Sequence, residues 1–413
     1  MLQPVGVGHK SLADYTHLVG RPLVEEVREL AEPLKGLKVL HLSATAFGGG
    51  VSEILYTLIP LMRDVGLEAE WQIILGREEF FNATKIMHNA LQGNPQDLTP
   101  EEWEIYERYN ELNAGSLSSG WDVIIVHDPQ PALIQRHVPE KGRSWVWRCH
   151  IDLSTPNPDT VGRLAPQLTD YDASVFHMDQ YVPGALRNAA GPRVHIVPPA
   201  IDPLSPKNMA LSPEDAAFVC DQFGIDVDRP LICQVSRFDP WKDPHGVIDA
   251  YRIVKERRSD VQLALVGSMA TDDPEGWEFF NSTVEYGSGD ADIHILNNLN
   301  NVGAIEVNAF QSQADVLIQK STREGFGLTV SEALWKARPF IGGDVGGIPL
   351  QVDDGTTGYL VSSAEECADR ATDILADPEL AKRLGRAGKE HVRTHFLTPR
   401  LLRDWLRIIQ ALR

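Results

Sequence analysis

The sequence predicts an α/β protein made of two doubly wound domains. Its 413 residues exceed the usual size of one hydrophobic core, and 43% of them are apolar. Short apolar runs alternate with longer amphipathic stretches, which is typical of βα units around mostly parallel sheets. A proline-rich connector at 197–208 separates two such series, because proline fixes φ and removes a backbone donor. We therefore expect an N-terminal domain at 1–200, a C-terminal domain at 206–394 and a hinge between them.

Each half of the chain contains six short apolar runs that predict strands. In the first half they are residues 37–43, 69–75, 122–127, 144–151, 173–177 and 193–199. In the second half they are residues 230–238, 261–267, 292–298, 314–321, 339–345 and 357–361. Open α/β sheets bind their ligands at the carboxyl ends of such strands, so the loops that follow them are the first places to look for a site.

Helix starts are marked by hydroxyl residues that precede proline. TPEE at 99–102 and SPED at 212–215 each place an N-cap side chain before proline and acids in the first turn. The polar stretch 77–120 therefore predicts inserted helices rather than disorder. In the tail 396–413, Leu, Trp and Ile recur at helical spacing, which predicts a closing helix.

The composition argues against several classes of protein. A formal net charge of −20 disfavours binding to nucleic acid or to anionic lipid. No secretion signal or membrane-spanning run is evident, so we expect a cytoplasmic protein; the choice between monomer and homodimer stays open. The cysteines form no Cys-x-x-Cys pair and predict neither a zinc site nor a disulfide framework. They are Cys149, Cys220, Cys233 and Cys367.

Three glycines follow the first predicted strand. Gly48, Gly49 and Gly50 stand between that strand and an apolar helical pattern, so the backbone could approach an anion at a positive helix N-terminus. The alternative is a plain tight turn, and this segment alone supports both interpretations equally. The glycines do not form the Gly-x-Gly-x-x-Gly dinucleotide fingerprint.

Two cations follow the first strand of the second half. Arg237 and Lys242 lie in the loop SRFDPWKD, at a strand's carboxyl end. Together they suit a diphosphate, which Arg binds through a planar fork and Lys as a point charge. The alternative is that both are solvated surface cations paired with Asp239 and Asp243.

Polar side chains stand where two strands of the first half end. His150 and Asp152 follow one strand, and His127, Asp128 and Gln130 mark the end of another. If the sheet is parallel, both loops face the same crevice. A histidine in an apolar run is more often a core residue than a catalyst, although a place at a strand's end favours a functional role.

The segment STREGFGLTVSEALWKARP, residues 321–339, predicts a strand end, a turn and a helix. Backbone N–H groups at a helix start form a site for phosphate; here they belong to Gly325, Phe326, Gly327 and Leu328. Glu324 lies in the turn and Glu332 about one turn into the helix, and a carboxylate can accept hydrogen bonds from both hydroxyls of a sugar diol. The alternative is a helix-capping acid followed by an exposed helical glutamate.

Taken together, these segments resemble the retaining glycosyltransferases of family GT4, which have two Rossmann-like domains facing a central cleft in the GT-B arrangement. The residues that carry the resemblance are Gly48 to Gly50, His150, Arg237, Lys242, Glu324 and Glu332. The resemblance spans almost the whole chain. It implies a C-terminal domain that binds a nucleotide sugar, an N-terminal domain that binds the acceptor, and a final helix, about 395–413, that packs back on the N-terminal domain.

Further segments resemble the trehalose glycosyltransferring synthases and related trehalose phosphorylases of this family. They include FFNATKIMHNALQGN, VHDPQPA, WRCHIDLS and REGFGLTVSEALWKARPFIGG. The resemblance implies reversible, retaining transfer of glucose from a nucleoside diphosphate glucose, with UDP, ADP or GDP as the nucleotide, to C1 of free glucose. Three alternatives stay open: a phosphorylase that uses inorganic phosphate, a GT4 enzyme with another acceptor, and a nucleotide-sugar-binding regulator without catalysis.

The resemblance also implies roles for individual residues. The expected catalytic residues are His150, Glu324, Arg237 and Lys242. The expected donor-binding set adds Gly48 to Gly50, Asn297 beside the base, Gly325 to Leu328, and Glu332. The acceptor-binding candidates are Asp128, Gln130 and Asp152.

Charge on the leaving diphosphate is expected to be stabilised by protein cations and N–H groups, where other transferases use a metal ion. We therefore expect no required cofactor and no metal-binding residues, although Mg²⁺ could stimulate the reaction without a dedicated site. The family's front-face mechanism implies that Glu324 holds the donor glucose and does not attack it. The expected partners are small molecules only: nucleoside diphosphate glucose, glucose and trehalose.

Overall fold

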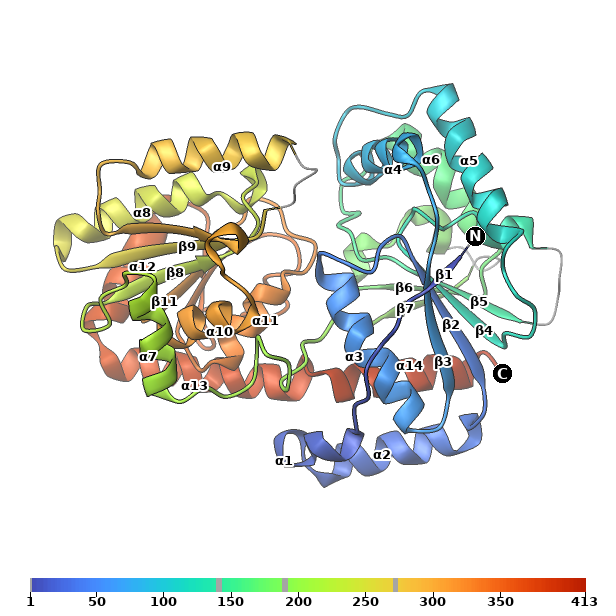
Figure 1. Cartoon of the computed structure of the whole chain (residues 1–413), viewed down its shortest axis with the longest axis horizontal. Helices are drawn as coiled ribbons and strands as arrows, with labels where there is room; N and C mark the ends of the chain where they lie inside the picture. The colour runs from blue at the N-terminus through green and yellow to red at the C-terminus, as the bar shows by residue number, and fades with distance from the viewer. Residues whose placement is uncertain (1, 139–142, 188–191, 270–273) are drawn as a thin grey trace. The chain divides into compact units, whose positions relative to one another are not determined.

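The computed structural model describes residues 2–138, 143–187, 192–269 and 274–413. The chain forms two compact units, each with its own sheet (Figure 1). Unit 1 comprises Met1–Ala200 and Thr398–Arg413, and unit 2 comprises Ile201–Leu397. The chain therefore crosses between the units twice, within the proline-rich connector and again just before the last helix.

Unit 1 is built on a seven-stranded sheet. Neighbouring strands run parallel except β1, which pairs antiparallel with β3. In spatial order the strands are β1 (Gln3–Pro4), β3 (Glu68–Ile73), β2 (Lys38–Ser43), β4 (Val123–His127), β5 (Ser144–Arg148), β6 (Ala173–Phe176) and β7 (Arg193–Ile196). The central strands are almost fully buried, as expected of parallel strands in the middle of an α/β domain.

The helices of unit 1 are α1 (Thr16–Val19), α2 (Arg21–Ala31), α3 (Gly50–Asp64), α4 (Glu78–Leu91), α5 (Pro100–Ala114), α6 (Pro158–Leu164) and α14 (Thr398–Ala411). The last of these, α14, buries Leu402, Trp405 and Leu406 and packs against α2 and α3 (Figure 1). Near its start, Arg400 donates hydrogen bonds to the carbonyls of Pro198 and Pro199, at 2.9 and 2.7 Å. The C-terminal helix is thus part of unit 1 although 197 residues of unit 2 precede it.

Unit 2 has a six-stranded sheet whose strands are all parallel. In spatial order they are β10 (Ile293–Asn297), β9 (Gln262–Gly267), β8 (Leu231–Val235), β11 (Val316–Gln319), β12 (Phe340–Gly343) and β13 (Tyr359–Val361). The helices are α7 (Pro213–Gln222), α8 (Pro244–Arg257), α9 (Pro274–Gly287), α10 (Ala304–Gln313), α11 (Leu328–Trp335), α12 (Ala364–Ala376) and α13 (Pro378–His395). Counted within the unit, the strand order is 3-2-1-4-5-6, that of a doubly wound nucleotide-binding sheet.

Every predicted strand is present, and several end earlier than predicted. The strand predicted at 144–151 ends at Arg148, because the N–H of His150 donates to the carboxylate of Asp128 at 2.7 Å. The strand predicted at 193–199 ends at Ile196, since Pro198 and Pro199 have no N–H to donate. The short strand β1 was not predicted, because two residues show no periodicity.

Both predicted helix caps are confirmed. The hydroxyl of Thr99 accepts a hydrogen bond from the N–H of Glu102 at 3.3 Å, and the Glu102 carboxylate accepts one from the N–H of Thr99 at 2.7 Å. Ser212 caps α7 by accepting a hydrogen bond from the N–H of Asp215 at 3.0 Å. The inserted helices predicted within 77–120 are α4 and α5.

The proline-rich connector contains no helix. Within it, Ile201 forms an isolated parallel bridge with Leu397, and its N–H donates to the carbonyl of Phe396 at 2.8 Å. The two segments in which the chain crosses between units are therefore held side by side. Over the described ranges, the helices are too short or too polar for any of them to cross a lipid bilayer.

Helix α13 approaches the end of α11 through a glycine. A Cβ on Gly385 would lie 2.1 Å from the carbonyl oxygen of Ala337. We expect Gly385→Ala to lower the free energy of unfolding by about 1–3 kcal/mol, because the helix must move away. Denaturant titration followed by circular dichroism measures the change.

The control for this variant is Gly162→Ala in α6, where a Cβ would meet no atom within 4 Å. Alanine is the better helix former, so this variant should keep or raise the stability. If Gly385→Ala and Gly162→Ala lowered the free energy of unfolding equally, the close approach at Gly385 would be contradicted.

Candidate active site

The centre of the unit 2 sheet places two predicted loops next to each other. Strands β8 and β11 are neighbours, and the strand order reverses between them. Where the order reverses, the loops at the carboxyl ends leave in opposite directions and open a ligand-binding crevice. The loop after β8 carries Arg237 and Lys242, and the loop after β11 carries Glu324.

Lys242 and Glu324 form a buried ion pair between these two loops. Nζ of Lys242 lies 2.7 Å from Oε2 of Glu324, and the side chains are 15% and 9% exposed. The hydroxyl of Ser321 donates to the same oxygen at 3.3 Å. The alternative pairing of Lys242 with Asp243 is wrong, since Asp243 pairs with Lys320. Because buried charges are costly unless they are paired, Lys242 and Glu324 stabilise each other's place in the fold.

Backbone hydrogen bonds reinforce this junction. The side-chain amide of Gln234, on β8, donates to the carbonyl of Lys242 at 2.7 Å. The N–H of Thr322, after β11, donates to the carbonyl of Trp241 at 2.8 Å. The backbone that carries Lys242 is therefore held from both strands.

Arg237 has a different environment. Its side chain is 66% exposed, and its guanidinium lies 3.0 Å from the carboxylate of Asp239. Asp239 also accepts hydrogen bonds from the N–H groups of Trp241 and Lys242, at 2.8 and 3.2 Å. The surface-pair interpretation thus describes the observed contact of Arg237 but not that of Lys242. Exposed pairs contribute little stability, so the guanidinium is available to a stronger anion.

The turn before α11 is shaped by glycine. Gly327 is the N-cap residue of α11 and has a φ of +79°. The side-chain amide of Gln351 donates to the carbonyl of Phe326 at 2.6 Å. Gly347 packs so close that a Cβ there would lie 2.6 Å from Cα of Phe326. The helix start is therefore held in place, and its N-cap residue offers no side chain to cover the positive end of the helix dipole.

Glu332 is buried, which contradicts the interpretation of an exposed helical glutamate. Its side chain is 1% exposed, and Oε1 lies 3.4 Å from Nζ of Lys207. Its other oxygen, Oε2, has no hydrogen-bond partner among the described residues. A buried polar atom without a partner is costly, and a ligand hydroxyl would satisfy it.

Asn297 lies apart from the ion pair. It ends β10, an edge strand, and β9 separates that strand from β8. Its side-chain oxygen accepts a hydrogen bond from the N–H of Leu299 at 2.8 Å. The structure therefore gives this oxygen a role in shaping its own loop, and it does not bring Asn297 beside Lys242.

In unit 1 the glycine loop joins β2 to α3. The helix begins at Gly50, and the φ angles of Gly48 and Gly49 are +70° and +92°. A Cβ on either residue would meet no atom within 4 Å. Glycine is therefore needed for the backbone conformation and not for packing. The predicted order of strand, glycine loop and helix is confirmed.

The loops after β4 and β5 are joined through Asp128. This residue has a φ of +64°, and its carboxylate accepts a hydrogen bond from the N–H of His150 at 2.7 Å. Its carbonyl accepts a hydrogen bond from the indole of Trp147 at 3.0 Å. Burial raises the pKa of Asp128 to about 7, while the hydrogen bond from His150 and the charge of Arg148 act in the opposite direction.

Gln130 and Asp152 lie in the same two loops. Asp152 is buried, and its carboxylate accepts a hydrogen bond from the N–H of Ser154 at 2.8 Å. Oε1 of Gln130 is buried without a hydrogen-bond partner among the described residues. The inserted helix α5 supports this loop, since the side chain of Asn110 donates to the carbonyl of Gln130 at 3.1 Å.

The structure groups the predicted His127 and His150 with two histidines that the sequence analysis did not single out, His41 and His177. A histidine stands at or near the carboxyl end of each of four adjacent strands, β2, β4, β5 and β6: His41, His127, His150 and His177. Nδ1 of His41 lies 2.9 Å from Nε2 of His127, and Nδ1 of His127 lies 2.9 Å from Nε2 of His150. The rings of His150 and His177 meet edge to face. The recurrence of histidine near successive strand ends was the available sequence signal.

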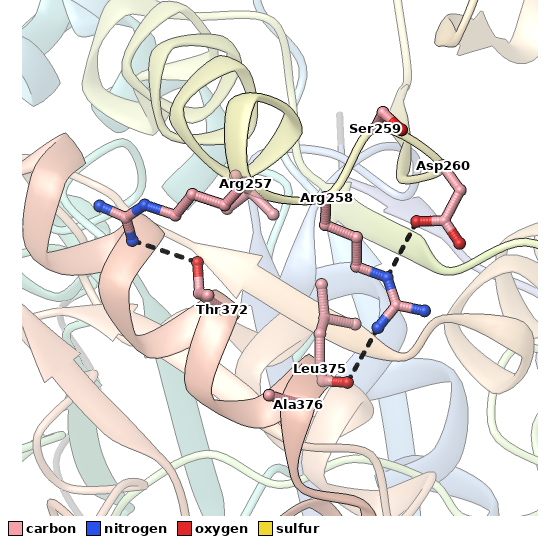
Figure 2. A pocket seen from close by; sticks show the side chains of 8 residues that line it. Arg257, Arg258, Ser259, Asp260, Thr372, Leu375 and Ala376 are labelled. Carbon is pink, nitrogen blue, oxygen red and sulfur yellow. Dashed lines mark hydrogen bonds and ion pairs between the residues drawn. The ribbon is translucent and has the colours of Figure 1, made fainter.

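A surface pocket of unit 2 lies away from these loops (Figure 2). Its arginines are already engaged: Arg258 bonds to Asp260 at 3.0 Å and to the carbonyl of Leu375 at 3.1 Å, and Arg257 bonds to Thr372 at 3.2 Å. The pocket lies at the end of α8, which leads into the amino end of β9. It is therefore not part of the candidate site, which gathers at the carboxyl ends.

Two protein families match the chain. Residues 41–183 match the family described as "Trehalose synthase, N-terminal domain". Residues 218–391 match the family described as "Glycosyl transferases group 1". The first match falls within unit 1 and contains the histidines, and the second falls within unit 2 and contains the Lys242–Glu324 pair.

Full-length relatives bear the same description. A trehalose synthase of Rubrobacter xylanophilus is 58% identical over 100% of this chain and 99% of its own length. A trehalose synthase of Pyrococcus horikoshii is 47% identical over 98% of this chain and 97% of its own length. A solved structure of sucrose-phosphate synthase from Thermosynechococcus elongatus aligns with a TM-score of 0.71, at 19% identity, over 91% of this chain and 99% of that chain. The structural likeness concerns the fold alone and agrees with the predicted α/β, GT-B class.

The raised pKa of Asp128 predicts a pH dependence of stability. Between pH 4 and 7 the native state holds a proton that the unfolded chain releases, so this group makes the protein less stable as the pH rises. The contribution is on the order of a few kcal/mol. Asp128→Asn removes it and keeps an oxygen for the N–H of His150. We expect the variant's advantage in unfolding free energy to grow from pH 4 to pH 8.

Denaturant titrations at several pH values measure this difference. Asp14→Asn, at an exposed position of the same unit, is the control for the loss of one carboxylate. If the gain in unfolding free energy of Asp128→Asn did not change with pH, or if Asp14→Asn showed the same gain, burial of Asp128 would not be its cause.

Proposed function

This chain belongs to the trehalose synthase family of group 1 glycosyltransferases, and we propose that it transfers glucose from a nucleoside diphosphate glucose to free glucose. The product is α,α-trehalose, formed reversibly and with retention at the anomeric carbon. The observation that carries the proposal is the buried Lys242–Glu324 pair at the reversal point of the unit 2 sheet, which joins the loop after β8 to the turn that leads into α11. The names of the full-length relatives support trehalose as the product.

Unit 2 offers the groups that a nucleotide sugar requires. Breaking the bond between C1 and oxygen leaves negative charge on the diphosphate. Positive charge gathers at the carboxyl ends of β8 and β11, from Lys242, the exposed Arg237 and the start of α11. It would stabilise the negative charge on the diphosphate as that charge develops. We propose that these groups act without a required metal ion, although Mg²⁺ could stimulate the reaction.

Glu324 would hold the donor glucose through its hydroxyls. Its Oε2 is bound by Lys242 and Ser321, which makes it a poor nucleophile. We propose instead that the departing phosphate oxygen takes the proton of the acceptor hydroxyl, while that hydroxyl attacks C1 from the same face. Retention then needs no covalent sugar–enzyme intermediate, unlike the two displacements of retaining glycosidases.

Glu332 favours a reaction that uses a nucleotide over a phosphorylase reaction that uses inorganic phosphate. Its buried Oε2 lacks a hydrogen-bond partner among the residues described, and a ribose diol would supply two donors. Inorganic phosphate has no diol, so a phosphorylase would leave this carboxylate unused. We propose that the base of the nucleotide binds near Asn297, where the backbone of the loop after β10 would contact it.

Unit 1 would contribute the acceptor site. We propose that His150 contacts the donor hexose, that the glycine loop approaches the donor, and that the acceptor glucose is bound by Asp128, Gln130 and Asp152. Two features support these roles: the loops that carry the residues are joined through Asp128, and Oε1 of Gln130 is buried without a partner in the described part of the chain.

A donor assay tests the proposed reaction. The protein is incubated with free glucose and UDP-, ADP- or GDP-glucose in turn, and the products are tested for a non-reducing disaccharide. We expect trehalose from at least one donor, and trehalose breakdown that requires the matching nucleoside diphosphate. Breakdown that requires inorganic phosphate would identify a phosphorylase, and absence of disaccharide with every donor would overturn the proposal.

The ion pair yields a second test. We expect Lys242→Met to lower kcat/KM by about 10²- to 10³-fold, because a preorganised charge facing the leaving group is lost. The variant also leaves the buried Glu324 carboxylate unpaired, so its unfolding free energy should fall by about 3 kcal/mol. The double variant Lys242→Met/Glu324→Gln should regain stability but not activity.

Lys382→Met is the control, since Lys382 forms an exposed pair with Glu379 on α13 and should affect neither property. If activity returned together with stability in the double variant, the pair would be structural only, and Lys242 would have no role in the reaction.

A further inference from the structure

Three histidines of unit 1 form a continuous hydrogen-bonded chain, here called the histidine array: His41, His127 and His150. The two N···N distances are both 2.9 Å, and the neighbouring rings are stacked with centroids 5.2 Å apart. The array runs from the interior toward the carboxyl edge of the sheet. His41 and His127 are buried, whereas His150 is half-buried.

The rings of the array are neutral at physiological pH. Burial lowers the pKa of His41 to about 3. Burial also lowers the pKa values of His127 and His150 well below the usual value, and the charge of Arg148 acts in the same direction. Each ring therefore carries one N–H and one bare nitrogen.

This proton count leaves two arrangements. Each N···N contact needs one proton, and His127 has a single proton for its two contacts. If His127 donates to His150, then His41 donates to His127, and His150 carries its proton on Nδ1. If His127 donates to His41, all three protons reverse, and His150 carries its proton on Nε2. The tautomer of His150 is thus coupled to that of His41.

The buried end of the array decides between the two arrangements. Nε2 of His41 is buried and has no hydrogen-bond partner in the described ranges. An N–H without an acceptor is the more costly of the two orphans, and bare acceptors are tolerated more often. The ring of Trp405 lies edge to face with His41, with centroids 6.1 Å apart, but a contact with an aromatic face is too weak to replace a hydrogen bond to the Nε2 position. We therefore assign the bare nitrogen of His41 to Nε2. This selects the first arrangement, in which His150 carries its proton on Nδ1.

We infer that His41 and His127 are positioning residues that hold His150 as its Nδ1–H tautomer, so that His150 presents a hydrogen-bond donor to an oxygen of the bound sugar. The identity of that acceptor rests on the proposed function, and the tautomer itself does not. Because the array is neutral, the donor would stay in place throughout the range in which a free histidine titrates.

Nuclear magnetic resonance of protein labelled with ¹⁵N in histidine reads the tautomer without substrate. The His150 signals are assigned from their absence in His150→Gln. We expect Nδ1–H in the unmodified protein. His41→Leu removes the donor to His127, so we expect His150 to become the Nε2–H tautomer or a mixture of both. The kcat/KM for trehalose formation should fall about tenfold, as for the loss of one neutral hydrogen bond.

His41→Asn offers an amide N–H near the former Nδ1 and should restore the Nδ1–H tautomer and most of the activity. A residue that served only packing would not show this rescue. The matched controls are His195→Leu and His195→Asn on β7, outside the array, which should leave the His150 signals unchanged.

An Nε2–H tautomer of His150 in the unmodified protein would overturn the inference. So would a His41→Leu variant with unchanged tautomer and turnover. If the Nδ1–H tautomer is found but no donor yields trehalose, the array stands and the proposed function fails, so the two failures are distinguishable.

Discussion

The ion pair between Lys242 and Glu324 is the interaction on which the unit 2 site depends. It joins the loops that leave two neighbouring strands in opposite directions, and it does so with little exposure to water. A buried pair of this kind adds little net stability, but removing one partner is costly. The pair therefore fixes geometry: it sets where the cation stands relative to the turn that opens α11, whose shape Gly327 and Gln351 hold from the other side.

The two units differ in the electrostatic character of their strand ends. Unit 2 presents the Lys242–Glu324 pair, the exposed Arg237 and a helix start, in a protein whose formal charge is −20. Unit 1 presents neutral imidazoles and a carboxyl group whose pKa is raised to about 7 by burial. Such a division suits the proposed reaction, in which charge develops on the donor and must be stabilised there, while the acceptor is bound through neutral hydroxyls.

The same topological rule places both sets of residues. In each sheet, parallel strands deliver their loops to one edge, so residues distant in sequence become neighbours. The inserted helices then support the loops of unit 1, as Asn110 does for the loop of Gln130. The same rule places the histidines close together: the register pairs His41 with Ile125 and His127 with Arg148, so each histidine lies two residues short of the next one.

Local periodicity, proline and side-chain-to-backbone hydrogen bonds were enough to predict the α/β class, every strand except β1, the connector and the caps at Thr99 and Ser212. The folded arrangement was needed to show that Lys242 pairs with Glu324, 82 residues away, and not with the adjacent Asp243. It was likewise needed to show that Glu332 is buried and that His41 meets His127, 86 residues later. These pairings depend on strand order and register, which local patterns do not specify.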